Sequence, residues 1–141
     1  MTSQLNVDTI VDKAGTGGTN VKVANNAVAV AEGGSATTNV VQGLVKAWSQ
    51  QDGATAVAND SFNVASITDE GTGDASFTYT SAMNNDNYSV VATTGYKAAT
   101  SVENSIVREI TTSKGRVRNT NDSGTYRDPG VYCTSVLGDL A

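Results

Sequence analysis

The 141-residue chain contains no histidine, one cysteine and one proline. Without histidine, Ser-His-Asp and Cys-His triads, imidazole metal sites and the usual general base near neutral pH are excluded. With Cys133 alone, neither an intrachain disulfide nor a Cys-x-x-Cys metal site can form. We therefore expect a chain without a histidine-based or cysteine-based catalytic centre and without cofactors.

Charge and long apolar runs are also scarce. Charged residues make up 16% of the chain, and the net charge is −5. An acidic chain is a poor match for nucleic acid, and no run approaches the roughly 20 apolar residues of a membrane helix. We expect neither nucleic-acid binding nor membrane insertion, and the first four residues do not resemble the start of a cleaved signal.

What the chain has instead is Val, Thr, Ser, Asn and 14 Gly, a composition that favours strands and turns. Residues 1–43 contain no aromatic side chain and cannot build a core by themselves. Within them, residues 21–24 and 27–30 flank Asn25-Asn26, which favours a short hairpin. We interpret residues 1–43 as an arm for attachment and trimerisation that needs a partner.

Alternation of apolar and polar residues begins at Leu44 and predicts a domain over residues 44–141. The alternation places Trp48, Phe62 with Val64, and Phe77 with Tyr79 in a common core. Turns are expected at Gly71–Asp74, Met83–Asn87 and Ser113–Gly115. The fold class is therefore all-β, an antiparallel β-sandwich of about seven short strands preceded by an extended arm.

The last expected strand, Val131–Leu137, is apolar on both of its faces. A strand of this kind is covered on both sides or lies at a subunit interface. If the strand lies at a subunit interface, Val131, Cys133 and Leu137 are candidates for a trimer interface.

Carboxylates offer few further candidates. Asp69, Glu70 and Asp74 could be calcium ligands, but a solvent-exposed hairpin turn selects the same residues, and we expect no metal site. Asp60, Asp69 and Glu103 could serve as a glycosidase acid and base, but their spacing carries almost no specificity. The chain is therefore expected not to be an enzyme.

Two stretches resemble virion proteins of tailed phages, especially those of marine bacteria and cyanobacteria. Residues 4–17 resemble the opening of such proteins. Residues 46–48, 60–74, 77–83 and 87–88, together with the ending at 136–141, resemble the terminal domain of tail-fibre-like proteins. The resemblance implies a virion structural protein on the exterior of tail or capsid, a homotrimer whose arm binds other virion proteins and whose sandwich projects.

The resemblance leaves three functions open. The first is a short tail fibre or fibre tip that contacts the host surface, the second is a capsid decoration protein, and the third is a glycan depolymerase. Because antiparallel strands reverse at alternating ends, and assuming a reversal near Asn59-Asp60, the arm enters opposite the two longest loops. Those loops, at 95–104 and 119–130, would carry the candidate host-contact residues Tyr96, Tyr126 and Arg127, which suit a surface glycan or protein.

Overall fold

The computed structural model describes residues 27–30, 37–95 and 103–138. The chain divides into two compact units, Met1–Val41 and Gln42–Ala141. In the first unit, β1 (Val28–Val30) pairs with β2 (Thr37–Asn39) in an antiparallel ladder. The hairpin predicted around Asn25-Asn26 lies partly outside the described residues, and Val28–Val30 pairs instead with a segment that follows it.

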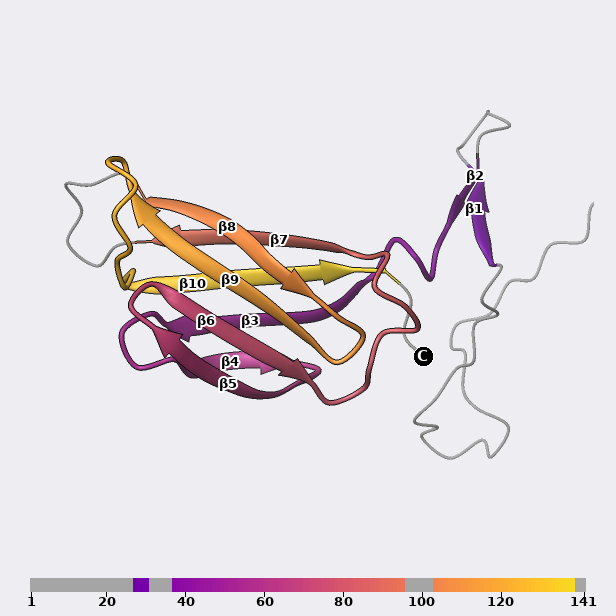
Figure 1. Ribbon diagram of the computed structural model, residues 1–141. Coiled ribbons are helices and arrows are strands. Elements are labelled where there is room, and N and C mark those ends of the chain that lie inside the picture. Colours follow the sequence, from indigo (N-terminus) through magenta and orange to yellow (C-terminus); the bar gives the residue numbers. More distant parts are fainter. Residues whose placement is uncertain (1–26, 31–36, 96–102, 139–141) are drawn as a thin grey trace, which may run out of the picture. The chain divides into compact units, whose positions relative to one another are not determined.

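The second unit is a sandwich of two four-stranded antiparallel sheets (Figure 1), so the predicted all-β sandwich is confirmed. One sheet, the β10 sheet, has the order β4-β3-β10-β7 and contains β3 (Val45–Asp52), β4 (Val57–Phe62), β7 (Ser89–Gly95) and β10 (Val131–Leu137). The other, the β9 sheet, has the order β5-β6-β9-β8 and contains β5 (Val64–Gly71), β6 (Asp74–Tyr79), β8 (Glu103–Ile110) and β9 (Lys114–Asn121). The two sheets of the sandwich contain eight strands, where about seven were expected. The described residues contain no helix that could cross a membrane.

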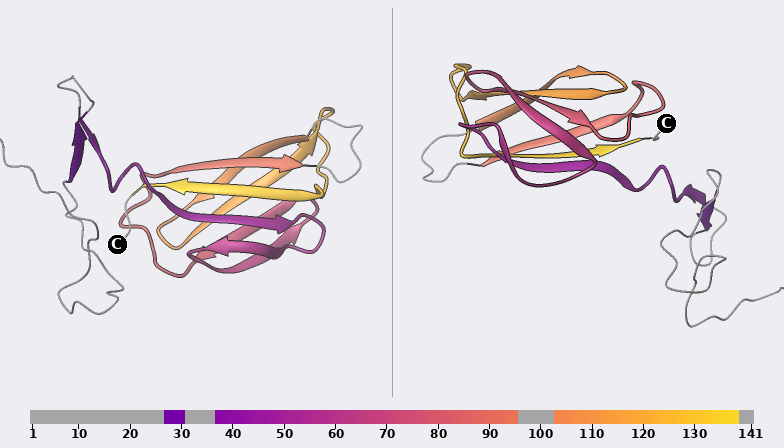
Figure 2. Two further views of the ribbon diagram at one scale, coloured as in Figure 1. Left: turned by 180° about the vertical axis from the view of Figure 1, so that it is seen from behind. Right: turned by 90° about the horizontal axis from the view of Figure 1, so that it is seen from below.

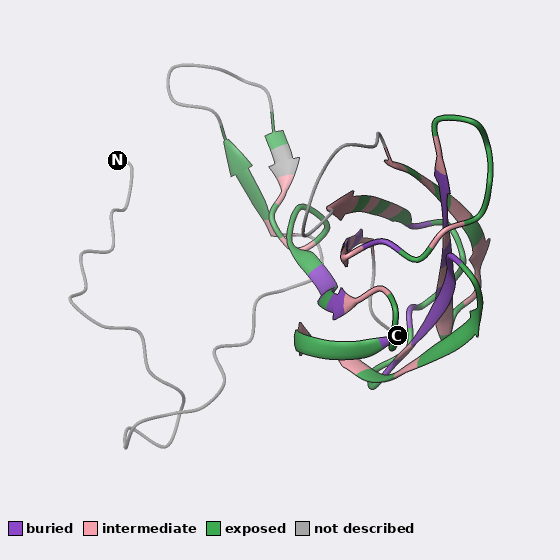
Figure 3. Ribbon diagram, turned by 90° about the vertical axis from the view of Figure 1, so that its left-hand side faces the viewer, coloured by how far each residue is buried: buried purple, intermediate pink, exposed green. Residues whose placement is uncertain are grey.

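The core lies between the two layers that Figure 2 shows, and it contains four aromatic residues: Phe77, Tyr79, Tyr88 and Tyr132. Phe77 meets Tyr79 edge to face at 5.8 Å between ring centres, and Tyr79 meets Tyr88 at 6.0 Å. The Tyr79 hydroxyl donates to the Tyr88 hydroxyl, which donates to the Thr111 carbonyl at 2.7 Å. The predicted inward face of Phe77 and Tyr79 on β6 is confirmed, and burial along the ribbon follows this core (Figure 3).

The corner between the sheets is formed by a single residue, Asn63, which has a positive φ of 55°. Its amide nitrogen donates to the Lys46 and Ser81 carbonyls at 3.0 and 3.1 Å, and its side-chain oxygen accepts from the Ser81 N–H. Asparagine tolerates this conformation better than most residues. Because the chain changes sheets here, Phe62 and Val64 do not share a face, and that prediction is wrong.

Trp48 also departs from its predicted place. It lies on the outer side of the β10 sheet and is 36% exposed, whereas its neighbours Ala47 and Ser49 are buried. The alternation of the strand is as expected, but the small and polar residues take its inward positions. Ser49 meets Thr134 inside the sandwich through a hydroxyl contact of 2.7 Å.

Candidate functional site

Three connections gather at one end of the sandwich, the loop end, at the left of Figure 1. They are the β3–β4 turn (residues 53–56), the β5–β6 turn (Thr72-Gly73) and the β9–β10 loop (residues 122–130). Strand β7 also ends at the loop end, and strand β8 begins there. The chain enters β3 and leaves β10 at the opposite end.

The 119–130 loop lies opposite the point of entry, as predicted, although the assumed reversal is misplaced. Residues 96–102 of the other predicted loop lie outside the described residues, and the strand ends that flank them lie at the loop end. Asn59-Asp60 lies within β4, and the reversals occur at residues 53–56 and at Asn63. Three strands, β3, β4 and β5, lie between the point of entry and the Gly71–Asp74 turn. Because this number is odd, the entry and the turn lie at opposite ends of the sandwich, as expected.

The loop end is locked together through the backbone of Gly73. The Tyr132 hydroxyl donates to the Gly73 carbonyl at 2.7 Å, and the Gly73 N–H donates to the Asp128 carboxylate. Gly73 has a φ of +68°, and a Cβ there would lie 2.7 Å from backbone atoms of Arg127 and Asn119. Only glycine fits this contact, so the β5–β6 turn and the β9–β10 loop form one packed unit.

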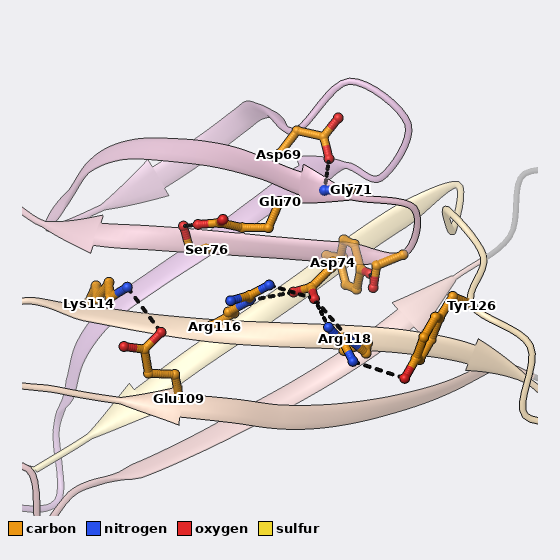
Figure 4. Close-up of polar contacts among 12 residues, drawn as sticks. Asp69, Glu70, Gly71, Asp74, Ser76, Glu109, Lys114, Arg116, Arg118 and Tyr126 are labelled. Atoms are coloured by element: carbon orange, nitrogen blue, oxygen red, sulfur yellow. Dashed lines mark hydrogen bonds and ion pairs between the residues drawn. The ribbon is translucent and has the colours of Figure 1, made fainter.

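Tyr126 projects from this unit and is 51% exposed. The Arg118 guanidinium carbon lies 4.5 Å from the ring centre, and Arg118 Nη1 donates to the Tyr126 hydroxyl at 2.9 Å. A cation–π contact and a hydrogen bond from Arg118 thus fix the Tyr126 ring (Figure 4), which keeps half of its surface open to solvent. Such a ring can stack on a sugar or an apolar group at a low cost in side-chain entropy.

Arg118 is itself held by Asp74, a buried carboxylate on the outer side of the β9 sheet. Asp74 accepts from Arg116 Nε at 2.7 Å and Nη2 at 2.8 Å, and from Arg118 Nε at 2.8 Å and Nη2. Burial raises the pKa of the Asp74 carboxyl, but the hydrogen bonds and charges of Arg116 and Arg118 outweigh it and leave the pKa below its usual range. The same contacts raise the pKa of both arginines.

The other predicted host-contact residues are placed differently. Arg127 Nη1 lies 3.7 Å from the buried Glu103 carboxylate, and the Asn119 side-chain amide joins Glu103 to the Arg127 carbonyl. The partly exposed Arg127 side chain therefore anchors the loop as well as facing solvent. Tyr96 lies outside the described residues.

The carboxylates considered for metal binding or catalysis are not brought together. Asp69 accepts from the Gly71 N–H, Glu70 from the Ser76 hydroxyl, and Asp74 from the two arginines. Asp60 lies on the β10 sheet, and Glu103 is buried between the layers. In the part of the chain that the structure describes, no group of three acidic, cysteine or histidine residues is placed to hold a metal.

The predicted interface residues Val131, Cys133 and Leu137 lie on the outer side of β10 and are half-buried, while Tyr132 and Val136 point into the core. Trp48 and Phe62 lie on the same outer side, directly opposite each other on β3 and β4. We call this surface, formed by Trp48, Phe62, Val91, Val131, Cys133 and Leu137, the Trp48 face. Sequence reasoning missed its two aromatic residues because it assigned them to the core.

A pocket of about 300 Å³ lies at the entry end, where the chain passes into β3 and out of β10. Its lining comes from the segments before β3 and β7 and from the end of β10: Gln42, Asn87, Tyr88, Ser89, Leu137 and Gly138. A Cβ at Gly138 would lie 2.5 Å from the Tyr88 Cβ and 3.3 Å from its Cα, so the chain at Gly138 passes close to the backbone of Tyr88.

Comparisons with protein families, with curated proteins and with solved structures find no match for this chain.

Proposed function

We propose that this protein is a structural component of a tailed-phage virion, a short homotrimeric tail fibre or fibre tip that contacts the host surface. The observation that carries the proposal is the division of the sandwich into two different ends. The chain enters and leaves at one end, and the packed loops that hold Tyr126 lie at the other. This arrangement suits a module attached at one end and exposed to a partner at the other.

The chemistry of the loop end fits recognition rather than turnover. Tyr126 presents a fixed, exposed ring, and its support is an arginine that is already engaged by Asp74. The contact residues thus lie on a rigid β scaffold, and little ordering is needed when a glycan or protein binds. In the proposed fibre, residues 1–43 attach the chain to other virion proteins.

The experiment that tests the proposal is a virion reconstruction combined with antibodies raised against the sandwich. Antibody label and density for the eight-stranded sandwich on the tail, with the Tyr126 loops pointing outward, are the expected results. Label on the capsid shell would overturn the tail assignment in favour of a decoration protein. Cleavage of purified host polysaccharide by the chain would favour a depolymerase.

A further inference from the structure

The outer surfaces of the two sheets differ sharply in charge. The strands of the β10 sheet contain only three charged residues: Lys46, which is buried, Asp52, which caps the β3–β4 turn, and Asp60 on the edge strand. The strands of the β9 sheet contain nine: Asp69, Glu70, Asp74, Glu103, Arg108, Glu109, Lys114, Arg116 and Arg118. Glu103 is buried between the layers, but even without it the β9 sheet has the charged outer surface that is typical of a solvated sheet.

A row of side chains crosses all four strands of the Trp48 face. Register places Phe62 opposite Trp48, Trp48 opposite Ser135, and Ser135 opposite Val91. Phe62 is 53% exposed and Val91 52% exposed. Leaving these aromatic and aliphatic side chains in water is unfavourable, and exposed apolar surface of this kind is typical of an interaction site.

From these observations we infer that the Trp48 face is a self-association surface, which other copies of the same chain cover, with Trp48 and Phe62 as its aromatic anchors. The inference rests on the self-association in the proposed function and names the surface that performs it. The six residues of the Trp48 face carry no charge, and the exposed Asp60 lies beside them on the edge strand β4. Copies of this face can converge around the three-fold axis of the proposed homotrimer with less repulsion between like charges than copies of the β9 sheet. Aromatic residues are the usual energetic anchors of such contacts, and Trp48 lies on the inner strand β3 of the sheet.

The size of the Trp48 face sets the strength of the contact. Four strands spaced by about 4.8 Å and seven residues of about 3.3 Å each give a face of roughly 440 Å² in projection. A stable interface of standard size buries about 800 Å² on each partner. This face alone should therefore support reversible association, and a stable assembly needs further area, which residues 1–43 would supply in the proposed fibre.

The test measures sedimentation of the full chain over a concentration series, for the unchanged protein and for Trp48→Thr and Phe62→Thr. Threonine keeps the strand propensity of both positions. We expect each substitution to raise the dissociation constant by about tenfold or more, as for removal of an interface anchor. Ile106→Thr is the matched control, because Ile106 is also a strand residue, 48% exposed, on the β9 sheet.

Two native probes report on the Trp48 face in the unchanged chain, so the test does not depend on the variants folding. Cys133 lies on this face and is the only cysteine, and Trp48 is the only tryptophan. Alkylation of Cys133 by iodoacetamide should slow as the chain associates, and Trp48 emission should shift to shorter wavelength over the same concentrations.

Three outcomes would overturn the inference. If the unchanged chain associates but Cys133 stays equally reactive and both threonine variants associate normally, the surface is wrong while the trimer of the proposed function stands. If the unchanged chain is a monomer throughout, the inference and that trimer both fail. If Trp48 emission responds to hydroxyethyl cellulose or mannan without any change in mass, the face binds carbohydrate rather than a second copy.

Discussion

Gly115 lies directly against the ring of Phe77, so that a Cβ at Gly115 would come within 2.4 Å of Phe77 Cζ. The two residues are also register partners on neighbouring strands β6 and β9. The ring thus occupies the space where a side chain on β9 would stand, and glycine is required by packing here.

We expect Gly115→Ala to destabilise the sandwich by about 1–3 kcal/mol, the usual cost of overpacking a close-packed core. Chemical denaturation measures the change. The double variant Gly115→Ala with Phe77→Leu is the control, because the smaller side chain makes room for the methyl group. Equal losses from the alanine substitution with Phe77 and with Leu at position 77 would show that the ring contact is not the cause.

Phe77 and Trp48 should respond very differently to removal. Phe77 is fully buried, so Phe77→Ala should cost about 3–5 kcal/mol, the range for emptying a large aromatic site in a core. Trp48 lies on the outer side of β3, and Trp48→Ala should cost about 1 kcal/mol. Thermal melts of both variants at a concentration where the chain is monomeric make the comparison, and a loss at Trp48 equal to that at Phe77 would contradict the outward placement.

The contrast shows where sequence reasoning works for this chain and where it fails. The Gly71–Asp74 turn, the inward faces of Phe77 and Tyr79 and the two apolar faces of β10 follow from local patterns, and the structure confirms them. Alternation alone cannot say which face of a strand is inward. On β3, Trp48 points outward, whereas Ala47 and Ser49 point inward. Choosing the more hydrophobic face of this strand as the inward one was therefore wrong.

The candidate site depends on contacts that no local pattern encodes. Asp74 binds two arginines 42 and 44 residues later in the chain, and Arg118 reaches Tyr126 through a loop. The corner at Asn63 likewise separates two apolar residues that stand only two positions apart. Those relationships come from sheet order and a positive φ, which composition and spacing do not specify.

Asp74 should make the stability of the sandwich sensitive to acid. Its pKa in the folded chain is lower than the ordinary value of 3.8, so its contribution is complete above pH 3.8 and is lost as the pH falls below that value. Asp74→Asn should cost about 1–3 kcal/mol near neutral pH, because the buried group no longer satisfies both arginines.

Denaturation at a series of pH values checks this prediction. The difference in stability between the parent chain and Asp74→Asn should shrink as the pH falls below 3.8. Glu109→Gln is the matched control, because Glu109 pairs with Lys114 at 3.0 Å while both side chains are more than a third exposed. A difference that stays constant to low pH would show that the charge of Asp74 does not stabilise the fold.

Removal of residues 1–43 should weaken assembly and leave the sandwich folded. Among the described residues, the core of the second unit is formed by residues from Ala47 to Val136, and each strand of the sandwich pairs with strands of its own sheet. Light scattering should therefore show a lower mass for the truncated chain, and circular dichroism should show a retained cooperative melt. An unchanged mass would mean that the arm takes no part in assembly, and loss of the melt would mean that the sandwich depends on it.

Tyr126→Ala should lower adsorption of virions to the host without changing the mass or the melting temperature of the protein. The ring is 51% exposed and contacts Arg118 by its face and its hydroxyl, so its removal takes away a rigid binding surface while Asp74 still holds the arginine. Tyr126→Phe should have an intermediate effect, because the ring remains but its hydrogen bond from Arg118 is lost. Ser123→Ala, in the same exposed loop, is the control, since the Ser123 N–H still donates to the Asn121 side-chain oxygen. Adsorption that is equal for all three variants and the parent would remove Tyr126 from the proposed host contact, whereas a fall in melting temperature would assign it to the stability of the loop.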